Sequence, residues 1–240
     1  MEGIALCVAA MLACFIAARR SIVWGVGLVM TLGYAYGILR ANVPNPAMHF
    51  LFDAGALGLY LALITRGLKP EQRSRLGALQ PWIALLVGWP LLLFLFPVQD
   101  PLVQLVGLRG QIFFIPFILI GAMLESDDWY ALAKWFAVLN LAAFGFALAE
   151  YIDGVPRFYP RNAMTTIIYS SKDVVGHTAF RIPSTFTSAA PYSTMMVATT
   201  TLLLGAQVQR RKRKRDFWLL SAAIVATGSA SAKRVIVPII

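Results

Sequence analysis

The chain has 240 residues, of which 59% are hydrophobic and only 13% are charged. A soluble fold of this length needs a larger share of polar residues to cover its surface, so the composition excludes an ordinary soluble protein. The net charge of +10 could indicate nucleic-acid binding, but the densest basic cluster, residues 210–215, lies between two apolar segments. A basic cluster in that position is typical of an anchor on anionic lipid headgroups, so we expect membrane lipid and no nucleic acid as its partner.

The apolar segments are long and continuous, without the alternation of barrel strands. Only helices and closed barrels satisfy every backbone polar group in lipid, and one spanning helix needs about 20 apolar residues. We therefore expect an all-α fold, a polytopic transmembrane helical bundle that forms a single domain with about eight spanning helices. The expected spans are residues 3–18, 21–39, 47–65, 81–97, 105–124, 131–149, 189–206 and 217–232.

The first two expected spans are separated by almost no connection, which predicts an antiparallel hairpin. The first span is not a signal peptide, because Arg19 and Arg20 follow the apolar run instead of preceding it. Pro90 and Pro116 lie in the fourth and fifth spans, where each is expected to kink its helix. Asn140, in the middle of the sixth span, is expected to hydrogen-bond to neighbouring helices.

The positions of lysine and arginine predict an N-terminus outside the cytoplasm, because most of these residues, including the 210–215 cluster, then face inward. On this topology the one long connection, residues 150–188, forms an external loop. The chain stops in the apolar run 235–240, which is too short to span a bilayer. We therefore expect a truncated protein.

No metal-binding, nucleophile-elbow or phosphate-loop motif occurs, so we expect neither a metal nor another cofactor. The external loop instead combines aromatic residues with Arg157, Arg161, Lys172 and Arg181. Guanidinium groups bind phosphate oxygens in pairs, which favours a site for a phosphorylated ligand. The alternative interpretation is an ordinary interfacial belt of aromatic residues with surface cations. His177 could act as a base at neutral pH, or it could be a solvated loop residue.

Three segments carry a resemblance to a known family. The first runs from Arg181 through Pro183 and Pro191 directly into a span, as Arg-Ile-Pro-Ser-Thr-Phe-Thr-Ser-Ala-Ala-Pro-Tyr-Ser. The second joins Gly107-Leu-Arg-Gly to Phe113-Phe-Ile-Pro, and the third is Thr227-Gly-Ser-Ala-Ser-Ala-Lys-Arg234. Together they resemble the O-antigen ligases and the O-antigen or exopolysaccharide polymerases, which are membrane glycosyltransferases. The resemblance covers roughly residues 80–240.

The resemblance implies transfer or polymerisation of an undecaprenyl-diphosphate-linked glycan on the outer face of a bacterial inner membrane, without a metal. Arg181, together with Arg109 or Arg234, would neutralise the diphosphate leaving group, and His177 is the second candidate for catalysis. Lys172 and Tyr192 are further candidates for substrate binding. Family members are usually longer, so the fragment itself is expected to be inactive, and other polysaccharide-assembly proteins are expected as partners.

Two other functions remain open at this point. A transporter or flippase would line a path between its helices with polar residues, and few such residues occur in the expected spans. A non-catalytic membrane scaffold would use the external arginines only to fix its orientation.

Overall fold

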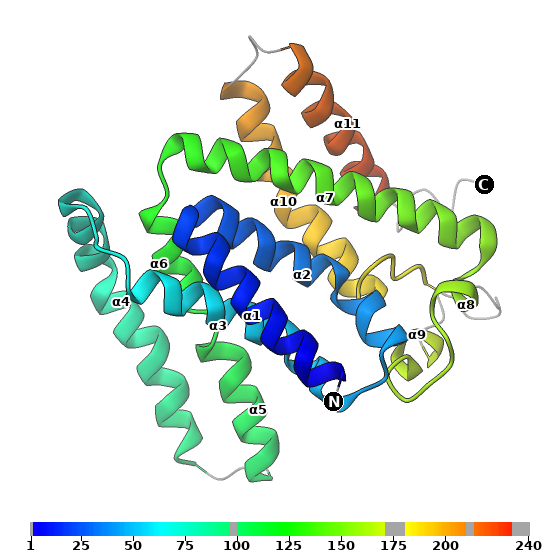
Figure 1. Cartoon of the computed structure of the whole chain (residues 1–240), viewed down its shortest axis with the longest axis horizontal. Coiled ribbons are helices and arrows are strands. Elements are labelled where there is room, and N and C mark those ends of the chain that lie inside the picture. The colour runs from blue at the N-terminus through cyan, green and yellow to red at the C-terminus, as the bar shows by residue number, and fades with distance from the viewer. Residues whose placement is uncertain (1, 97–99, 171–180, 210–213, 232–240) are drawn as a thin grey trace. The chain divides into compact units, whose positions relative to one another are not determined.

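A computed structural model describes residues 2–96, 100–170, 181–209 and 214–231 (Figure 1). Every regular element within these ranges is a helix, so the prediction of an all-α helical bundle is confirmed. The chain divides into two compact units. Unit 1 comprises residues 1–63 and 127–240, and unit 2 comprises residues 64–126.

The helices of unit 1 come from both ends of the sequence. Its N-terminal part contains α1 (Glu2–Arg20), α2 (Ile22–Asn42), the short 3-10 helix η1 (Pro46–Phe50) and α3 (Leu51–Ile64). Its C-terminal part contains α7 (Ser126–Asp153), α8 (Val155–Phe158), α9 (Thr166–Ser170), α10 (Ala189–Gln209) and α11 (Lys214–Ser231). Figure 1 shows α7 crossing the unit beside both parts.

Unit 2 contains α4 (Pro70–Phe94), α5 (Pro101–Ile112) and α6 (Pro116–Met123). A proline begins each helix, where its missing N–H would have no helical partner in any case. The expected disruption at Pro116 takes the form of a short break, which divides this span into α5 and α6, while Pro90 lies inside α4.

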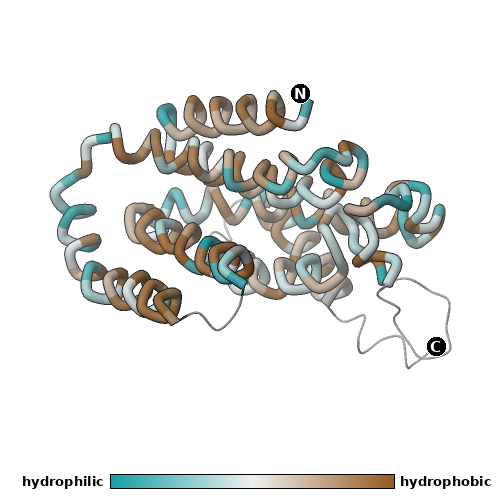
Figure 2. Tube along the Cα trace, turned by 90° about the horizontal axis from the view of Figure 1, so that it is seen from below, coloured by the Kyte–Doolittle hydropathy of each residue, from teal (hydrophilic) through white to brown (hydrophobic). Residues whose placement is uncertain are grey.

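The helices have the length and composition of membrane spans. Six apolar stretches among the described residues are long enough to cross a bilayer, so the chain is a multi-pass membrane protein. They are Glu2–Arg20, Ile22–Asn42, Pro46–Ile64, Pro70–Phe94, Val103–Met123 and Ser126–Asp153. Figure 2 shows mainly hydrophobic helices, with hydrophilic residues gathered near their ends.

Six of the eight expected spans overlap these stretches, and the last two do not meet the same measure of length and hydropathy within the described residues. The seventh expected span coincides with α10, which is 21 residues long but carries several threonines and glutamines that lower its mean hydropathy. The eighth coincides with α11, whose apolar stretch Asp216–Ala230 is shorter than the six others.

The first two helices form the expected hairpin. Ser21 separates them, because its side-chain oxygen accepts a hydrogen bond from Val23 N–H at 3.2 Å and so caps α2. The hairpin packs closely on α3, where a Cβ added at Gly58 would lie 2.1 Å from the Met11 carbonyl oxygen. Small residues allow helices in lipid to approach in this way.

A buried polar cluster joins the two parts of unit 1. The Asn140 side chain on α7 accepts a hydrogen bond from Tyr34 Oη on α2, at 2.5 Å. Its amide group donates to Thr199 Oγ1 on α10 and to Thr227 Oγ1 on α11, at 2.8 and 3.3 Å. The prediction that Asn140 binds neighbouring helices is therefore confirmed.

Candidate functional site

The candidate site lies at one end of unit 1, which we call the loop end. It consists of the C-terminal ends of α2 and α7 together with residues 154–170 and 181–188. The first of these segments packs against α2, because Ala41, Val155, Tyr159 and Ile168 form one buried apolar cluster. Asn162 Nδ2 also donates a hydrogen bond to the Ala41 carbonyl oxygen, at 2.8 Å. Figure 1 shows α8 and α9 near the end of α2.

The expected external loop 150–188 is therefore largely folded against the bundle in its described part. Its first residues belong to α7, which continues to Asp153. Sequence reasoning ended the helix too early because Glu150 and Asp153 made this last turn polar.

Residues 181–188 enter the bundle between α2, α7 and α10. Pro183, Ser184 and Phe186 are buried, and the Phe186 ring lies between Tyr34 and Tyr192, with ring centroids 5.0 and 5.8 Å away. Gly37 on α2 permits this entry, because a Cβ there would lie 2.0 Å from the Phe186 carbonyl carbon. The segment that carries the family resemblance is thus part of the core of the loop end.

Ser184 is the point at which this segment is held. Its backbone N–H donates a hydrogen bond to Glu150 Oε2 at 2.8 Å, and its hydroxyl donates to the Ala143 carbonyl oxygen at 2.6 Å. Its φ angle of 54° lies in the left-handed region, which a residue with a side chain seldom adopts. Glu150 is only 1% exposed, so this contact is closed to solvent.

Tyr159 binds the same segment from the opposite direction. Its hydroxyl donates to the carbonyl oxygens of Ser184 and Phe186, at 2.5 and 3.0 Å. Burial raises the pKa of the Tyr159 hydroxyl, and the nearby Glu150 charge raises it further. The hydroxyl therefore stays protonated at physiological pH and remains a hydrogen-bond donor.

Arg181 begins the held segment. Its side chain is half-buried, and the adjacent Ile182 packs against the apolar cluster around Phe186. The arginine thus stands at the edge of the packed region, and its Nε atom is buried. This position suits a cation whose place is fixed by the fold.

Several polar atoms at the loop end are buried without a hydrogen-bond partner among the described residues. They are Tyr192 Oη, Thr185 Oγ1 and Arg40 Nε. Buried polar atoms are bonded in most proteins, so unsatisfied ones mark strain or a place for a polar group from outside the chain. Thr185 and Arg40 belong to adjoining elements, because the Thr185 carbonyl accepts a hydrogen bond from Ile38 N–H on α2.

The other arginines of the expected loop are engaged by neighbours. Arg157 forms an exposed ion pair with Asp153 at 3.0 Å, and the Arg161 guanidinium lies 5.0 Å from the centre of the Tyr169 ring. Tyr192 packs against Phe186 in the same segment that Arg181 begins, whereas Arg157 and Arg161 lie in the preceding segment.

The remaining predicted site residues lie elsewhere. Lys172, His177 and Arg234 fall outside the described residues. Arg109 is half-buried on α5 and belongs to unit 2.

Sequence reasoning missed Glu150, Tyr159 and Ser184. Glu150 had a usable signal, because a carboxylate at the end of an apolar helix requires a partner. Ser184 had no such signal, because the sequence Pro-Ser-Thr does not predict a positive φ angle at the serine.

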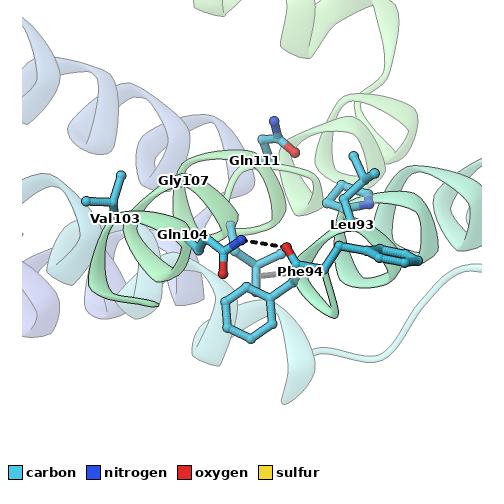
Figure 3. A pocket seen from close by; sticks show the side chains of 9 residues that line it. Leu93, Phe94, Val103, Gln104, Gly107 and Gln111 are labelled. Atoms are coloured by element: carbon cyan, nitrogen blue, oxygen red, sulfur yellow. Dashed lines mark hydrogen bonds between the residues drawn. The ribbon is translucent and has the colours of Figure 1, made fainter. Parts of the chain in front are cut away.

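Unit 2 contains a groove of a different character. The groove has a volume of about 420 Å³ and is lined mainly by apolar side chains of α4 and α5 (Figure 3). Gln104 and Gln111 are the polar residues in this lining. Gln104 Nε2 donates to the Phe96 carbonyl oxygen at 2.8 Å, which leaves the lining largely hydrocarbon. Such a lining suits an alkyl or isoprenoid chain better than a phosphate or a sugar.

Within the part of the chain that the structure describes, no three His, Cys, Asp or Glu residues group as metal ligands would. Comparison with models of known protein families finds no match, and comparisons with curated proteins and with solved structures find none either. The loop end must therefore be interpreted from its own chemistry.

Proposed function

We propose that this protein transfers or polymerises a glycan carried on undecaprenyl diphosphate, as the O-antigen ligases and polymerases do. The observation that carries the proposal is the folding of the Arg181–Ser188 segment into the loop end, with Arg181 at its edge. A surface loop with incidental cations would need neither the buried Glu150 contact nor the Tyr159 contact. The fold supports a fixed arginine at the place where the resemblance expects one.

The chemistry requires a cation that does not move as charge develops. An acceptor hydroxyl oxygen would form a bond to the anomeric carbon, while the bond from that carbon to the phosphate oxygen breaks. The hydroxyl proton leaves to a base, and the diphosphate departs with the bonding electrons. A guanidinium held in place stabilises this developing negative charge without first having to reorganise. Arg181 is the residue to which we assign this role.

The other predicted site residues keep their proposed roles. Arg109 and Arg234 are candidates for the second cation, Lys172 for a further phosphate contact, and His177 for the base. Tyr192 is only 4% exposed and its hydroxyl is buried, so a contact with substrate would require the loop end to open around it.

We also propose that the loop end faces outward from a bacterial inner membrane, with the N-terminus on the same external side. The basic cluster at residues 210–215 then faces the cytoplasm, as the distribution of lysine and arginine favours. Lipid-linked glycans are joined on the external side, so this orientation places Arg181 where the donor diphosphate is available.

The test uses the product of the complete gene in a strain that lacks it. Arg181→Ala should reduce glycan chain formation about 10- to 100-fold at normal membrane abundance, because one charged phosphate contact is lost. Arg181→Lys should also be impaired, since a lysine keeps the charge but loses the planar fork. Arg157→Ala is the matched control, because Arg157 already pairs with Asp153 on the surface.

Two outcomes would contradict the proposal. Normal chain formation in Arg181→Ala would reject the role of this residue, and an equal loss in Arg157→Ala would indicate a generic cationic surface. In the same strains, a single cysteine at Gln209 reports orientation, and its labelling in intact cells by a membrane-impermeant reagent would reverse the topology.

A second candidate function is transport or flipping of a lipid-linked substrate. A path would have to open at the polar cluster around Asn140, which in the structure is buried and hydrogen-bonded within the bundle. This function predicts that the Asn140→Leu variant retains glycan joining but leaves lipid-linked substrate on the cytoplasmic side. Substrate accumulation in Arg181→Ala on the external side would instead favour transfer.

A further inference from the structure

Glu150 is the most deeply buried acidic side chain that the structure describes at the loop end, at 1% exposure. It stands in the last turn of α7, a helix long and apolar enough to span a membrane. Burying a carboxylate removes it from water, and this cost must be offset by hydrogen bonds or opposite charge. Glu150 therefore requires a specific role in the fold or in the site.

The carboxylate of Glu150 binds the backbone of the 181–188 segment. Its Oε2 accepts the Ser184 N–H at 2.8 Å. The other polar groups of Ser184 are also bound, since its hydroxyl donates to Ala143 O and its carbonyl accepts from Tyr159 Oη. A single residue is thus fixed through its N–H, its side chain and its carbonyl.

The conformation of Ser184 explains why such a fixation is needed. A positive φ angle in a residue with a side chain is unfavourable and persists only where the surroundings impose it. A carboxylate acceptor makes a stronger hydrogen bond to a backbone N–H than a neutral acceptor does. Glu150 is therefore well suited to hold the backbone in this left-handed turn.

The turn at Ser184 is coupled to Arg181 through a short and stiff connection. Pro183 lies between them, buried, and its ring fixes one backbone angle. Ile182 packs against the cluster around Phe186, which leaves Arg181 as the first residue at the edge. A displacement of Ser184 would consequently displace the Arg181 backbone.

We propose that Glu150 is a positioning residue, whose carboxylate holds the Ser184 turn and thereby sets the place of the Arg181 guanidinium. We assign it an effect on the reaction through Arg181 and not a contact with substrate, because its side chain is only 1% exposed. The effect on glycan transfer rests on the proposed function, whereas the effect on the segment does not.

The first measurement reports the segment alone. A single cysteine replaces Thr185, whose hydroxyl oxygen is buried, in a background with Cys7 and Cys14 substituted. Its rate of reaction with a maleimide in membranes should be slow when Glu150 is intact. Glu150→Ala should accelerate labelling about tenfold or more, because the Ser184 N–H loses its acceptor. Glu150→Gln should fall between, because the amide oxygen still accepts that bond.

The matched control is Asp153→Asn. Asp153 lies on the same helix three residues further on, but its side chain is 36% exposed and pairs with Arg157 on the surface. Its substitution should leave the labelling rate unchanged. Equal labelling in Glu150→Ala, Glu150→Gln and the parent would overturn the proposal, and so would an equal increase in Asp153→Asn.

The second measurement is glycan chain formation by the same variants at matched membrane abundance. We expect activity to fall in the order of increasing labelling rate, with Glu150→Gln retaining more activity than Glu150→Ala. Faster labelling with unchanged chain formation would uphold the positioning role and reject the role of Arg181 in transfer. If Glu150→Ala does not reach the membrane, Glu150→Gln alone tests the proposal. Its labelling rate must exceed that of the parent, and an equal rate would overturn the proposal.

Discussion

Unit 1 places a carboxylate between its helices at each end, and the two carboxylates do different things. At the loop end, Glu150 is 1% exposed and accepts a backbone N–H from Ser184. At the opposite end, Asp216 on α11 accepts the Tyr130 hydroxyl at 2.7 Å and lies 3.7 Å from Lys134 Nζ. The Asp216 and Lys134 side chains are 15% and 35% exposed.

The difference lies in what replaces each contact when it is lost. Water can reach the partners of Asp216, so a broken bond there is exchanged for a hydrated one. The Ser184 N–H has no such access, and losing its acceptor leaves a buried polar group unsatisfied. The Asp216 end thus fastens one helix to another, whereas the Glu150 end shapes a backbone turn. Only a turn of the second kind is useful for holding a functional side chain in one place.

The largest effect is expected where the loop end is most crowded. Gly37→Ala places a Cβ 2.0 Å from the Phe186 backbone, and backbone cannot move aside as a flexible side chain can. We expect a loss of about 3 kcal/mol in stability, at the upper end for an overpacked core, measured by thermal unfolding in detergent. Gly145→Ala on α7 is the control, because a Cβ there meets nothing within 4 Å. Equal stability of the two variants would show that the segment is not packed against α2.

A smaller effect is expected at the opposite end. Asp216→Asn keeps an acceptor for Tyr130 and loses only the long, partly exposed ion pair with Lys134. The loss in stability should be below about 1 kcal/mol and should shrink further in high salt. The same unfolding assay, run at low and high ionic strength, measures it. A loss larger than about 2 kcal/mol would place Asp216 in the same class as a buried carboxylate and remove the contrast between the two ends.

The smallest effect is expected for the exposed carboxylate of unit 2. Glu125 accepts a hydrogen bond from Lys69 Nζ at 2.7 Å, and this contact lowers its pKa below the ordinary value of 4.5. Because the pKa is lowered in the folded protein, the pair stabilises the fold above pH 4.5. This stabilisation is lost as the pH falls through the lowered value. Carboxyl NMR titration should find a higher pKa for Glu125 in Lys69→Gln than in the parent. Equal pKa values would show that the pair does not form in solution.

The helical fold followed from the sequence because apolar runs of this length have no other stable form in lipid. Whether α10 spans the membrane is harder to decide from the sequence. Thr199, Thr200 and Thr201 each bond a carbonyl oxygen in their own helix, so their hydroxyls are satisfied inside the helix. A hydropathy sum counts these residues as polar whether or not their hydroxyls are bonded.

Some residues of the candidate site could be predicted from the sequence and others could not. Arg181 and Tyr192 were selected from the sequence because they lie in a segment with a recognisable resemblance. Glu150 and Tyr159 act on that segment from 34 and 25 residues away, and such pairings depend on the fold. Pairing of this kind is invisible to local patterns, as is the left-handed turn at Ser184, which tertiary contacts impose.

The Asn140 cluster has a consequence for how the protein is made. Its members enter the membrane at different times, because Tyr34 is synthesised first and Thr227 last. Until α10 and α11 arrive, the amide hydrogens of Asn140 lack the hydroxyls that accept them in the folded unit. An unsatisfied amide in lipid is costly, so α7 gains its full stability only when α10 and α11 dock against it. The stability of the early helices in their packed arrangement thus depends on residues that are synthesised later.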